Sequence, residues 1–342
     1  IIDPPVFLAP MAGYTDSATR TICRHFGCGA TLTELTNAAG LVHNSSATWH
    51  ILYSSQQERP LGAHIYGADE AILAKAVELI YKTGRFDFID LNCGCPINRI
   101  MAKGAGAALV NDPAKIYKLV QAMANASPLP ITVKTRIGSK AEKKNAVEIA
   151  SAVKEGGGQA LFLHARYTIA KHSGEAHWNV LAEVAQAKIL PIVGNGGIYN
   201  ANDVFRMIKE TYVDGVMIGR AAVGNPWIFQ HVLSIFQTGV YQPHSLSEHK
   251  EIILTHLYKL MELKKNEPRY KNKDIKTIEQ STILHFRAHL YRYLAGFKSW
   301  AELRRKLNSL KTIDELVALV EKVFSNQPGD IAPFTGGLVK VG

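Results

Sequence analysis

The sequence predicts a (β/α)8 barrel, or TIM barrel, followed by a small all-helical C-terminal domain. Eight short apolar segments, each suited to a buried strand, recur before residue 230, and amphipathic segments of helix length separate most of them. Beyond residue 249 the pattern is helical and offers no further strand candidate. A doubly wound open sheet is the alternative, but no Gly-rich dinucleotide fingerprint follows the first strand.

The eight predicted strands are short and apolar. They are Val6–Ala9, Thr31–Glu34, Gly62–Tyr66, Phe86–Leu91, Ile131–Thr135, Ala160–Leu163, Ile189–Gly194 and Gly215–Ile218. The helices expected between them are Asp16–Phe26, Asp69–Thr83, Pro113–Ala126, Lys143–Glu155, Trp178–Ala187 and Ala201–Lys209. Strands that alternate with helices in this way favour a barrel with a parallel sheet.

The C-terminal part predicts a small helical bundle. Its helices are expected at His249–Leu263, Ile278–Ala295, Ser299–Leu307 and Ile313–Phe324, with a Lys-rich hydrophilic hinge between the first two. We therefore expect a catalytic domain over residues 1–240 and a helical domain over 241–330. Residues 331–342 are expected to be a loosely held tail.

Composition places the chain among soluble globular proteins. It has 342 residues, of which 47% are hydrophobic and 20% charged, and no apolar run is long enough for a transmembrane helix. The first residues lack the basic and apolar regions of a signal peptide. Four cysteines are too few for a disulfide framework at this length, so we expect a reduced, cytoplasmic setting.

Positive charge is concentrated in the C-terminal part. The chain has a net charge of +10, and residues 251–311 hold 14 Lys or Arg against 6 Asp or Glu. This asymmetry indicates a polyanion such as a nucleic acid as the partner of that part. A solvated helical face that aids solubility is the alternative.

Chemically active residue types follow nearly every predicted strand, and the carboxyl ends of the strands are where a barrel carries its function. In chain order these stretches are Pro10-Met11-Ala12-Gly13, His64 with Tyr66-Gly67, Asn92 to Pro96, Lys134-Thr135-Arg136, His164-Ala165-Arg166, Gly194 to Gly197 and Gly219-Arg220. Gly-rich turns after the seventh and eighth strands are typical of a barrel phosphate site. Backbone N–H groups at Gly196, Gly197, Gly219 and Arg220 would face the phosphate, although tight turns alone also require glycine.

The segment DLNCGCPINRIMAKGAGAALV (Asp90 to Val110) is the most informative stretch of the chain. Cys95 directly follows a strand and precedes a basic loop that includes Lys103, a position that suits a reactive group facing a pocket. The alternative is that Cys93 and Cys95 are small core residues. Lys134 would suit an anionic flavin ring or an oxyanion; otherwise it is a lysine in solvent at a strand end.

A series of motifs resembles the flavin-dependent tRNA-dihydrouridine synthases, most closely the bacterial B-type subfamily. In order they are APMAGYTD (Ala9 to Asp16), DLNCGCP (Asp90 to Pro96), KGAGAALV (Lys103 to Val110), VKTRIG (Val133 to Gly138), LHAR (Leu163 to Arg166), GNGGI (Gly194 to Ile198) and MIGRAAVGNPWIF (Met217 to Phe229). They span nearly the whole predicted barrel. The later FRAHLYRYLAG resembles the family's RKH-x-x-WYL signature weakly, with Ala288 in place of its lysine and Arg292 in place of its tryptophan.

The resemblance implies an FMN-binding barrel with tRNA held in a basic groove between barrel and helices. NADPH reduces FMN, hydride passes from flavin N5 to C6 of a uridine, and Cys95 acts as the acid that protonates C5. The residues it implies for the cofactor are Pro10, Met11, Ala12, His64, Lys134, His164, Asn195, Gly196, Gly197, Gly219 and Arg220. Those it implies for the substrate are Asn92, Arg166, Lys103, Arg287, His289 and Arg292. His64 stands where the family usually has a glutamine. No metal is implied, and we expect a monomer.

Physical chemistry agrees with this scheme. Reduction of a conjugated ring needs a hydride source that no side chain provides, and it needs one proton, which a thiol can deliver. The target base must leave its stack, and a basic helical domain can hold the RNA by its shape and phosphates. Two alternatives stay open: a flavin oxidoreductase of dihydroorotate dehydrogenase type acting on a small molecule, and an RNA-binding protein or tRNA chaperone without chemistry.

Overall fold

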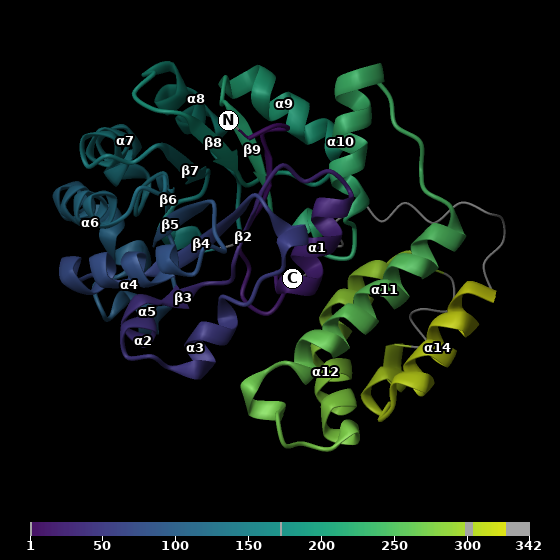
Figure 1. Cartoon of the computed structure of the whole chain (residues 1–342). Coiled ribbons are helices and arrows are strands. Elements are labelled where there is room, and N and C mark those ends of the chain that lie inside the picture. The colour runs from purple at the N-terminus through teal and green to yellow at the C-terminus, as the bar shows by residue number, and fades with distance from the viewer. Residues whose placement is uncertain (1, 172, 298–303, 326–342) are drawn as a thin grey trace.

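A computed structural model describes residues 2–171, 173–297 and 304–325, and within them a parallel sheet winds into a barrel (Figure 1). Hydrogen-bonded neighbours follow the order β1-β9-β8-β7-β6-β5-β4-β2, and every strand pairing is parallel. A bridge between Phe7 and Ala30 joins the two ends of this order, with the Leu8 amide donating to the Ala30 carbonyl at 3.1 Å. The predicted TIM barrel with C-terminal helices is therefore confirmed.

The strand bounds agree with the prediction to within a few residues. The barrel strands are β1 Val6–Leu8, β2 Thr31–Leu32, β4 Leu61–Tyr66, β5 Phe88–Cys93, β6 Ile131–Arg136, β7 Ala160–His164, β8 Ile192–Asn195 and β9 Gly215–Ile218. The second predicted strand is cut short at Leu32. A further short strand, β3 (Thr36–Asn37), pairs with the end of β4 and was not predicted.

Helices surround the barrel on its outer face (Figure 1). They are α1 Ser17–His25, α4 Glu70–Lys82, α6 Pro113–Ala126, α7 Ala146–Glu155, α8 Trp178–Gln186, α9 Ala201–Thr211 and α10 Trp227–Thr238. Helix α10 was not predicted, nor were three short helices, α2 Ala38–Val42, α3 Ser46–Ile51 and α5 Asn98–Met101. Side chains of Asp16, Asp69 and Asp112 accept hydrogen bonds from the first turns of α1, α4 and α6, which explains where these helices begin.

Successive side chains along each strand point alternately into the barrel and out toward the helices, and this produces two separate apolar layers. Phe7, Phe88 and Phe162 belong to a small cluster inside the barrel, with the rings of Phe7 and Phe162 5.2 Å apart edge to face. Ile89 and Leu91, the odd positions of β5, belong instead to the large cluster between sheet and helices. Because successive side chains of a strand point to opposite faces, Asp90 and Asn92 must face the barrel interior.

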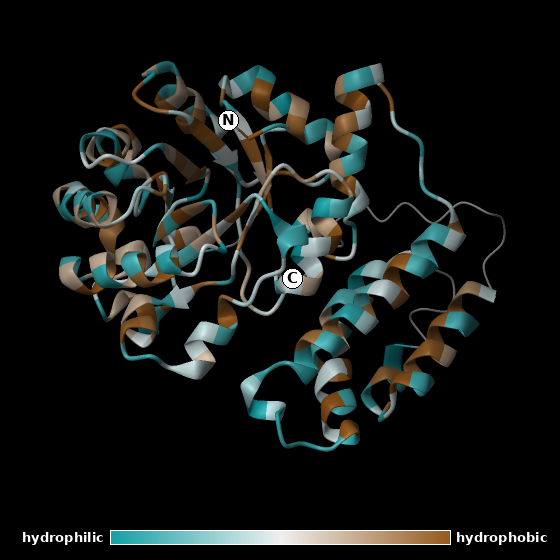
Figure 2. Ribbon diagram, viewed as in Figure 1, coloured by the Kyte–Doolittle hydropathy of each residue, from teal (hydrophilic) through white to brown (hydrophobic). Residues whose placement is uncertain are grey.

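The C-terminal helices pack around a third apolar cluster. They are α11 Leu246–Lys265, α12 Ile275–Tyr293 and α14 Ile313–Ser325, and each mixes hydrophobic with hydrophilic residues along its length (Figure 2). Ala18 of α1 and Trp227 of α10 belong to the same cluster, so these helices share a core with one side of the barrel. Among the described residues, no helix is both long and apolar enough to span a membrane.

Two predictions for the C-terminal part concern residues that lie partly or wholly outside those that the structure describes. The first part of the helix expected at Ser299–Leu307 lies outside them, and its end forms a 3₁₀ turn at Arg304–Asn308. The predicted tail, residues 331–342, also lies outside them. The predicted division at residues 240 and 241 falls between α10 and α11 and stays a prediction.

Candidate active site

Two adjoining cavities open at the carboxyl ends of the barrel strands, where the sequence predicts the site. Their volumes are about 120 Å³ and about 370 Å³. Both are lined by Pro10, Met11, Lys134, His164 and Arg220, so the two cavities form one continuous site. The first adds the glycine turns after β8 and β9, and the second adds the segment after β5 that contains Cys95.

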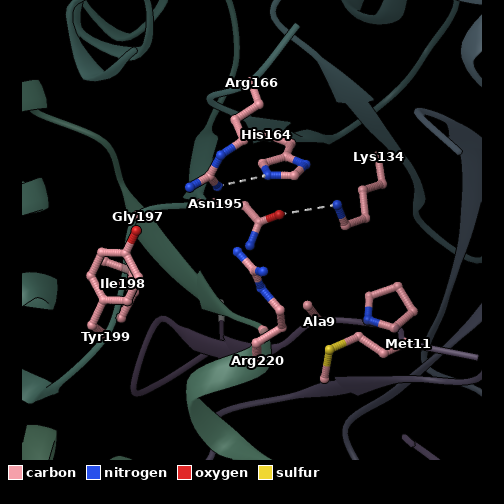
Figure 3. Close-up of a pocket in the computed structure, with 13 residues that line it drawn as sticks. Ala9, Met11, Lys134, His164, Arg166, Asn195, Gly197, Ile198, Tyr199 and Arg220 are labelled. Carbon is pink, nitrogen blue, oxygen red and sulfur yellow. Dashed lines mark hydrogen bonds between the residues drawn. The ribbon is translucent and has the colours of Figure 1, made fainter. Parts of the chain in front are cut away.

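Cationic side chains converge on the first cavity (Figure 3). Lys134, Arg166 and Arg220 reach into it from three different strand ends, beside His164. Burial lowers the pKa of Arg220, and the neighbouring Arg166 and Arg292 lower it further. Like charges held this close favour an anionic ligand that would neutralise them.

The turn after β8 must be glycine for two separate reasons. Gly196 and Gly197 have φ of +101° and +80°, which L-residues with a side chain rarely adopt. A Cβ at Gly196 would lie 2.7 Å from Cδ2 of His164. The turn therefore brings bare backbone to the wall of the first cavity, as a phosphate cradle requires.

Asn195 holds Lys134 in place. The Lys134 ammonium donates to Oδ1 of Asn195 at 3.2 Å, and Nδ2 of Asn195 donates to the Met217 carbonyl at 2.8 Å (Figure 3). Burial, and then the charge of Arg136, lower the pKa of Lys134 to about 8. The lysine is thus a tethered cation whose charge is sensitive to its surroundings near neutral pH.

A hydrogen-bonded row crosses the floor of the second cavity. The strand register places His64 beside Asp90 and Asp90 beside Thr132. Oδ2 of Asp90 lies 2.7 Å from Nδ1 of His64, and the Thr132 hydroxyl donates to Oδ1 of Asp90 at 2.7 Å. The carboxylate accepts from Nδ1–H, so Nε2 of His64 is an acceptor, and Nδ2 of Asn92 donates to it at 2.9 Å.

Hydrogen bonds of Asn92 connect this row to the segment that contains Cys95. With its amide nitrogen directed at His64, its Oδ1 accepts from the amides of Cys95 at 3.0 Å and Gly94 at 3.3 Å. Both ring nitrogens of His64 are therefore engaged in the wall of the site. In this hydrogen-bonding pattern Asp90 holds the proton of His64 on Nδ1.

Cys95 and Cys93 have different environments. Cys95 is half-buried and lines the second cavity, whereas Cys93 is fully buried in the apolar layer between sheet and helices. Burial raises the pKa of the Cys95 thiol, although Arg136 and Lys134 oppose the rise. Cys95 is thus a protonated thiol at neutral pH that faces a cavity, and Cys93 packs as a core residue.

Arg136 is a site residue that the sequence analysis quoted without giving it a role. Its guanidinium is buried, and it donates from Nε to the Gly94 carbonyl at 2.8 Å and from Nη1 to the Tyr167 carbonyl at 3.2 Å. It thereby fixes the backbone next to Cys95. The available signal was its spacing of two from Lys134, which puts both side chains on the interior face of β6.

Some of the remaining predicted site residues line the two cavities and others lie outside them. Ala12 and Asn92 line the second cavity and Gly219 the first. Lys103 is exposed on the loop after α5 and lines neither cavity. Arg292, on α12, packs against Gly224 in the loop after β9 and is near enough to Arg220 to lower its pKa. The helical part therefore reaches the edge of the site.

His289, which the resemblance implies for substrate binding, does not lie on the surface of this structure. Its side chain is completely buried, with a solvent-exposed fraction of 0%, and it faces the barrel through an edge contact with Tyr14. Arg287, two residues earlier on α12, is partly buried, and no described residue forms a hydrogen bond with its Nε. Only the outer positions of α12 can meet a macromolecule from solvent.

Comparisons with known proteins agree on one family. The family described as Dihydrouridine synthase (Dus) matches residues 7–327. The chain is 32% identical over 323 residues to tRNA-dihydrouridine synthase B of Pseudomonas aeruginosa, covering 94% of this chain and 93% of that one. It is 33% identical over 337 residues to a probable tRNA-dihydrouridine synthase of Mycobacterium tuberculosis, covering 95% and 83%.

Solved structures show the fold alone. The 6-hydroxypseudooxynicotine amine oxidase HisD of Pseudomonas geniculata N1 superposes with a TM-score of 0.56 at 9% identity over 74% of this chain. Histamine dehydrogenase of Rhizobium sp. 4-9 does so with a TM-score of 0.53 at 12% identity over 75%. The chain spans about half the length of these two proteins, 50% and 49%.

Proposed function

Because the chain belongs to the dihydrouridine synthase family of oxidoreductases, we propose that it reduces the C5–C6 bond of a uridine in tRNA, with FMN as cofactor and NADPH as reductant. One observation carries the proposal: the half-buried Cys95, whose pKa burial raises, faces the same continuous site as a cationic, glycine-lined cradle. The site thus combines a proton donor with a place for an anionic cofactor.

The residues present fit FMN. The bare backbone at Gly196 and Gly197 and the charge of Arg220 suit its phosphate. Arg166, which the resemblance implies for the substrate, lines the same cavity and would add to this charge. Lys134, held by Asn195, suits the electron-rich side of the flavin ring, with Met11 and Pro10 as apolar wall. When bound, FMN supplies the hydride for C6 of the uracil, and NADPH restores its reduced form.

Cys95 supplies the proton in this proposal. Its S–H bond breaks as a C–H bond forms at C5, which leaves a thiolate that takes a proton back from solvent. The charges of Arg136 and Lys134, which oppose the rise of its pKa, stabilise that thiolate. Asn92 and Arg136 hold the backbone around Cys95, so the thiol meets C5 from a fixed position.

The tRNA is proposed to lie against the cationic side of the helical part. From the last residue of α11 to the first turn of α12 the exposed side chains include five cations, Lys265, Arg269, Lys271, Lys273 and Lys276. Phosphate contacts from such residues give affinity without sequence preference. A cytoplasmic, monomeric enzyme is part of the proposal; the four cysteines are free.

The proposal is tested with purified holoenzyme, NADPH and two substrates in parallel. An unmodified tRNA transcript should gain two mass units at a uridine, and free uridine or uracil should not react measurably. Turnover of the free pyrimidine with an unchanged tRNA would replace the proposal by the small-molecule oxidoreductase. Absence of bound flavin and of turnover would leave RNA binding without chemistry.

A further inference from the structure

Three potential metal ligands meet where the barrel contacts the helical part, outside the proposed active site. Asp16 comes from the loop between β1 and α1, and His285 and His289 come from α12. One ligand atom of each lies within 4.8 Å of those of the other two. The histidines are four residues apart, so both side chains project from one face of the helix, as in many zinc-binding helices.

Several polar atoms in this cluster are buried without a hydrogen-bond partner among the described residues. His289 is completely buried, and neither of its ring nitrogens has a hydrogen-bond partner among the described residues. Asp16 is 5% exposed, and its Oδ1 accepts from the Thr19 amide at 2.9 Å. Its buried Oδ2 accepts no hydrogen bond from the described residues and lies 3.5 Å from Nε2 of His285. Such atoms cost free energy unless a ligand satisfies them.

We propose that Asp16, His285 and His289 bind a divalent transition-metal ion of the zinc class. Two imidazole nitrogens and a carboxylate oxygen form an established zinc ligand set, with a fourth position for water. Nε2 of His285 already lies 3.5 Å from Oδ2 of Asp16. Ligand atoms around zinc lie roughly 3.3 Å apart, so only the wider pairs in the cluster must close, by about 1.5 Å at most.

The surroundings provide the other features that a metal site needs. A cavity of about 150 Å³ is lined by both Asp16 and His285 and gives an ion a path from solvent. The Thr19 amide fixes the orientation of the carboxylate. The neighbouring His256 packs its ring 4.5 Å from that of His289 and is itself held by the Tyr293 hydroxyl at 3.0 Å.

The bound ion would link α12 to the loop between β1 and α1, which also contributes residues to the proposed active site. In the metal-free structure Nε2 of His285 lies 3.2 Å from the Gly13 carbonyl, in the same loop as Met11, and it would exchange this hydrogen bond for the ion. The proposal goes beyond the proposed reaction and holds whether or not that reaction is right. It departs from the expectation of no metal, since Asp16 is far from the histidines in sequence and only the fold brings them together.

The test uses the full-length holoenzyme, stripped with a chelator and titrated with Co²⁺ as a spectroscopic probe for zinc. We expect one equivalent of Co²⁺ to bind, with the visible absorbance of a tetrahedral site, and Zn²⁺ to displace it. Zn²⁺ should also raise the thermal midpoint of unfolding, because it binds only the folded protein. Neither readout depends on enzyme activity.

Variants decide whether the ion occupies this cluster. Asp16→Asn keeps a good helix cap but removes the carboxylate, and His285→Gln removes a partly exposed ligand. Each should weaken Co²⁺ binding at least tenfold, whereas His43→Gln, at an exposed histidine elsewhere, should not. Equal binding in the cluster variants, or no binding to the wild type at a tenfold excess of Co²⁺, would overturn the proposal.

Discussion

His64 and Asp90 sit side by side on neighbouring strands, with Nδ1 of the histidine 2.7 Å from Oδ2 of the aspartate inside the barrel. Both side chains are almost fully buried, and the pair connects through Asn92 to the amide of Cys95. A hydrogen-bonded row in the wall therefore sets the position of the proposed acid. Substitutions in the hydrogen-bonded row and at Cys95 can therefore test the positioning of the thiol separately from its chemistry.

Asp90→Asn should destabilise the protein and misplace the Cys95 segment. The amide cannot accept from both His64 and Thr132 as the carboxylate does, so a buried donor loses its partner, which costs roughly 1–3 kcal/mol. Urea unfolding gives the loss, and turnover should fall more than FMN affinity. Glu78→Gln, in an exposed ion pair with Lys75, should unfold at the same urea concentration as wild type. Equal midpoints for both variants would show that the row has no structural role.

Cys95→Ala should lose most turnover while FMN and tRNA still bind. Removal of a general acid costs about a hundredfold to ten-thousandfold in rate. Cys93→Ala is the matched control, because that side chain lies in the apolar layer behind the strand. It should keep its turnover and lose only stability. Undiminished product formation by Cys95→Ala would remove Cys95 from the acid role.

FMN affinity should fall as pH rises above about 8. The pKa of Lys134 in the ligand-free site is about 8, so the ammonium is present below that pH and is lost above it. A bound anion favours the ammonium, and binding must take up a proton once the free lysine is neutral. Flavin fluorescence titrations from pH 6.5 to 9.5 measure the effect. Lys134→Met should bind FMN more weakly with a flatter profile, and Lys118→Met, exposed on α6, should match wild type.

Gly196→Ala should weaken FMN binding at least tenfold. The new Cβ would meet His164 at 2.7 Å, and the backbone has a φ of +101°. Gly84→Ala separates the two effects, because Gly84 also has a positive φ of +64° but nothing lies within 4 Å of its Cβ. That control should cost about 1 kcal/mol of stability and leave FMN affinity unchanged. Wild-type affinity in Gly196→Ala would place the phosphate elsewhere.

Arg292→Ala should weaken tRNA binding and reduce its salt dependence. Removing one cation that pairs with a phosphate makes the slope of log K against log salt shallower by about 0.7–0.9. Filter binding over a range of salt concentrations measures this slope. Lys75→Ala, on the outer face of α4, is the control and should leave the slope as it is. A slope unaltered by Arg292→Ala would remove this arginine from the interface.

The sequence predicted the barrel and the strand ends because both depend on local patterns. Apolar runs separated by helix-length segments define the strands, and glycines or cations after most of these runs mark the site. The structure then brings Lys134, His164 and Arg220 to a common cavity from three strands. Helix α10 begins inside the GNPWIF motif, at Trp227, and was missed because that motif was interpreted only as a family resemblance. Asn225 followed by Pro226 was an available start signal.

Contacts between residues far apart in the chain could not be predicted from the sequence. The row from Thr132 to Asn92 follows from the strand register, which periodicity alone does not fix. The burial of His289 depends on how α12 meets the barrel, so an RNA contact inferred from a weak motif was replaced by a contact with Tyr14. The sequence indicates that Asp16 caps the start of a helix, but it does not show that its carboxylate lies close to two histidines of α12.

The central claim is tested most directly by mass spectrometry of tRNA from a strain that lacks this gene. The gene is restored as wild type, Cys95→Ala or Cys93→Ala, with protein levels matched by immunoblot. We predict that one uridine position loses two hydrogens in the deletion strain, regains them with wild type and Cys93→Ala, and does not regain them with Cys95→Ala. Identical tRNA masses in the deletion and wild-type strains would contradict the account.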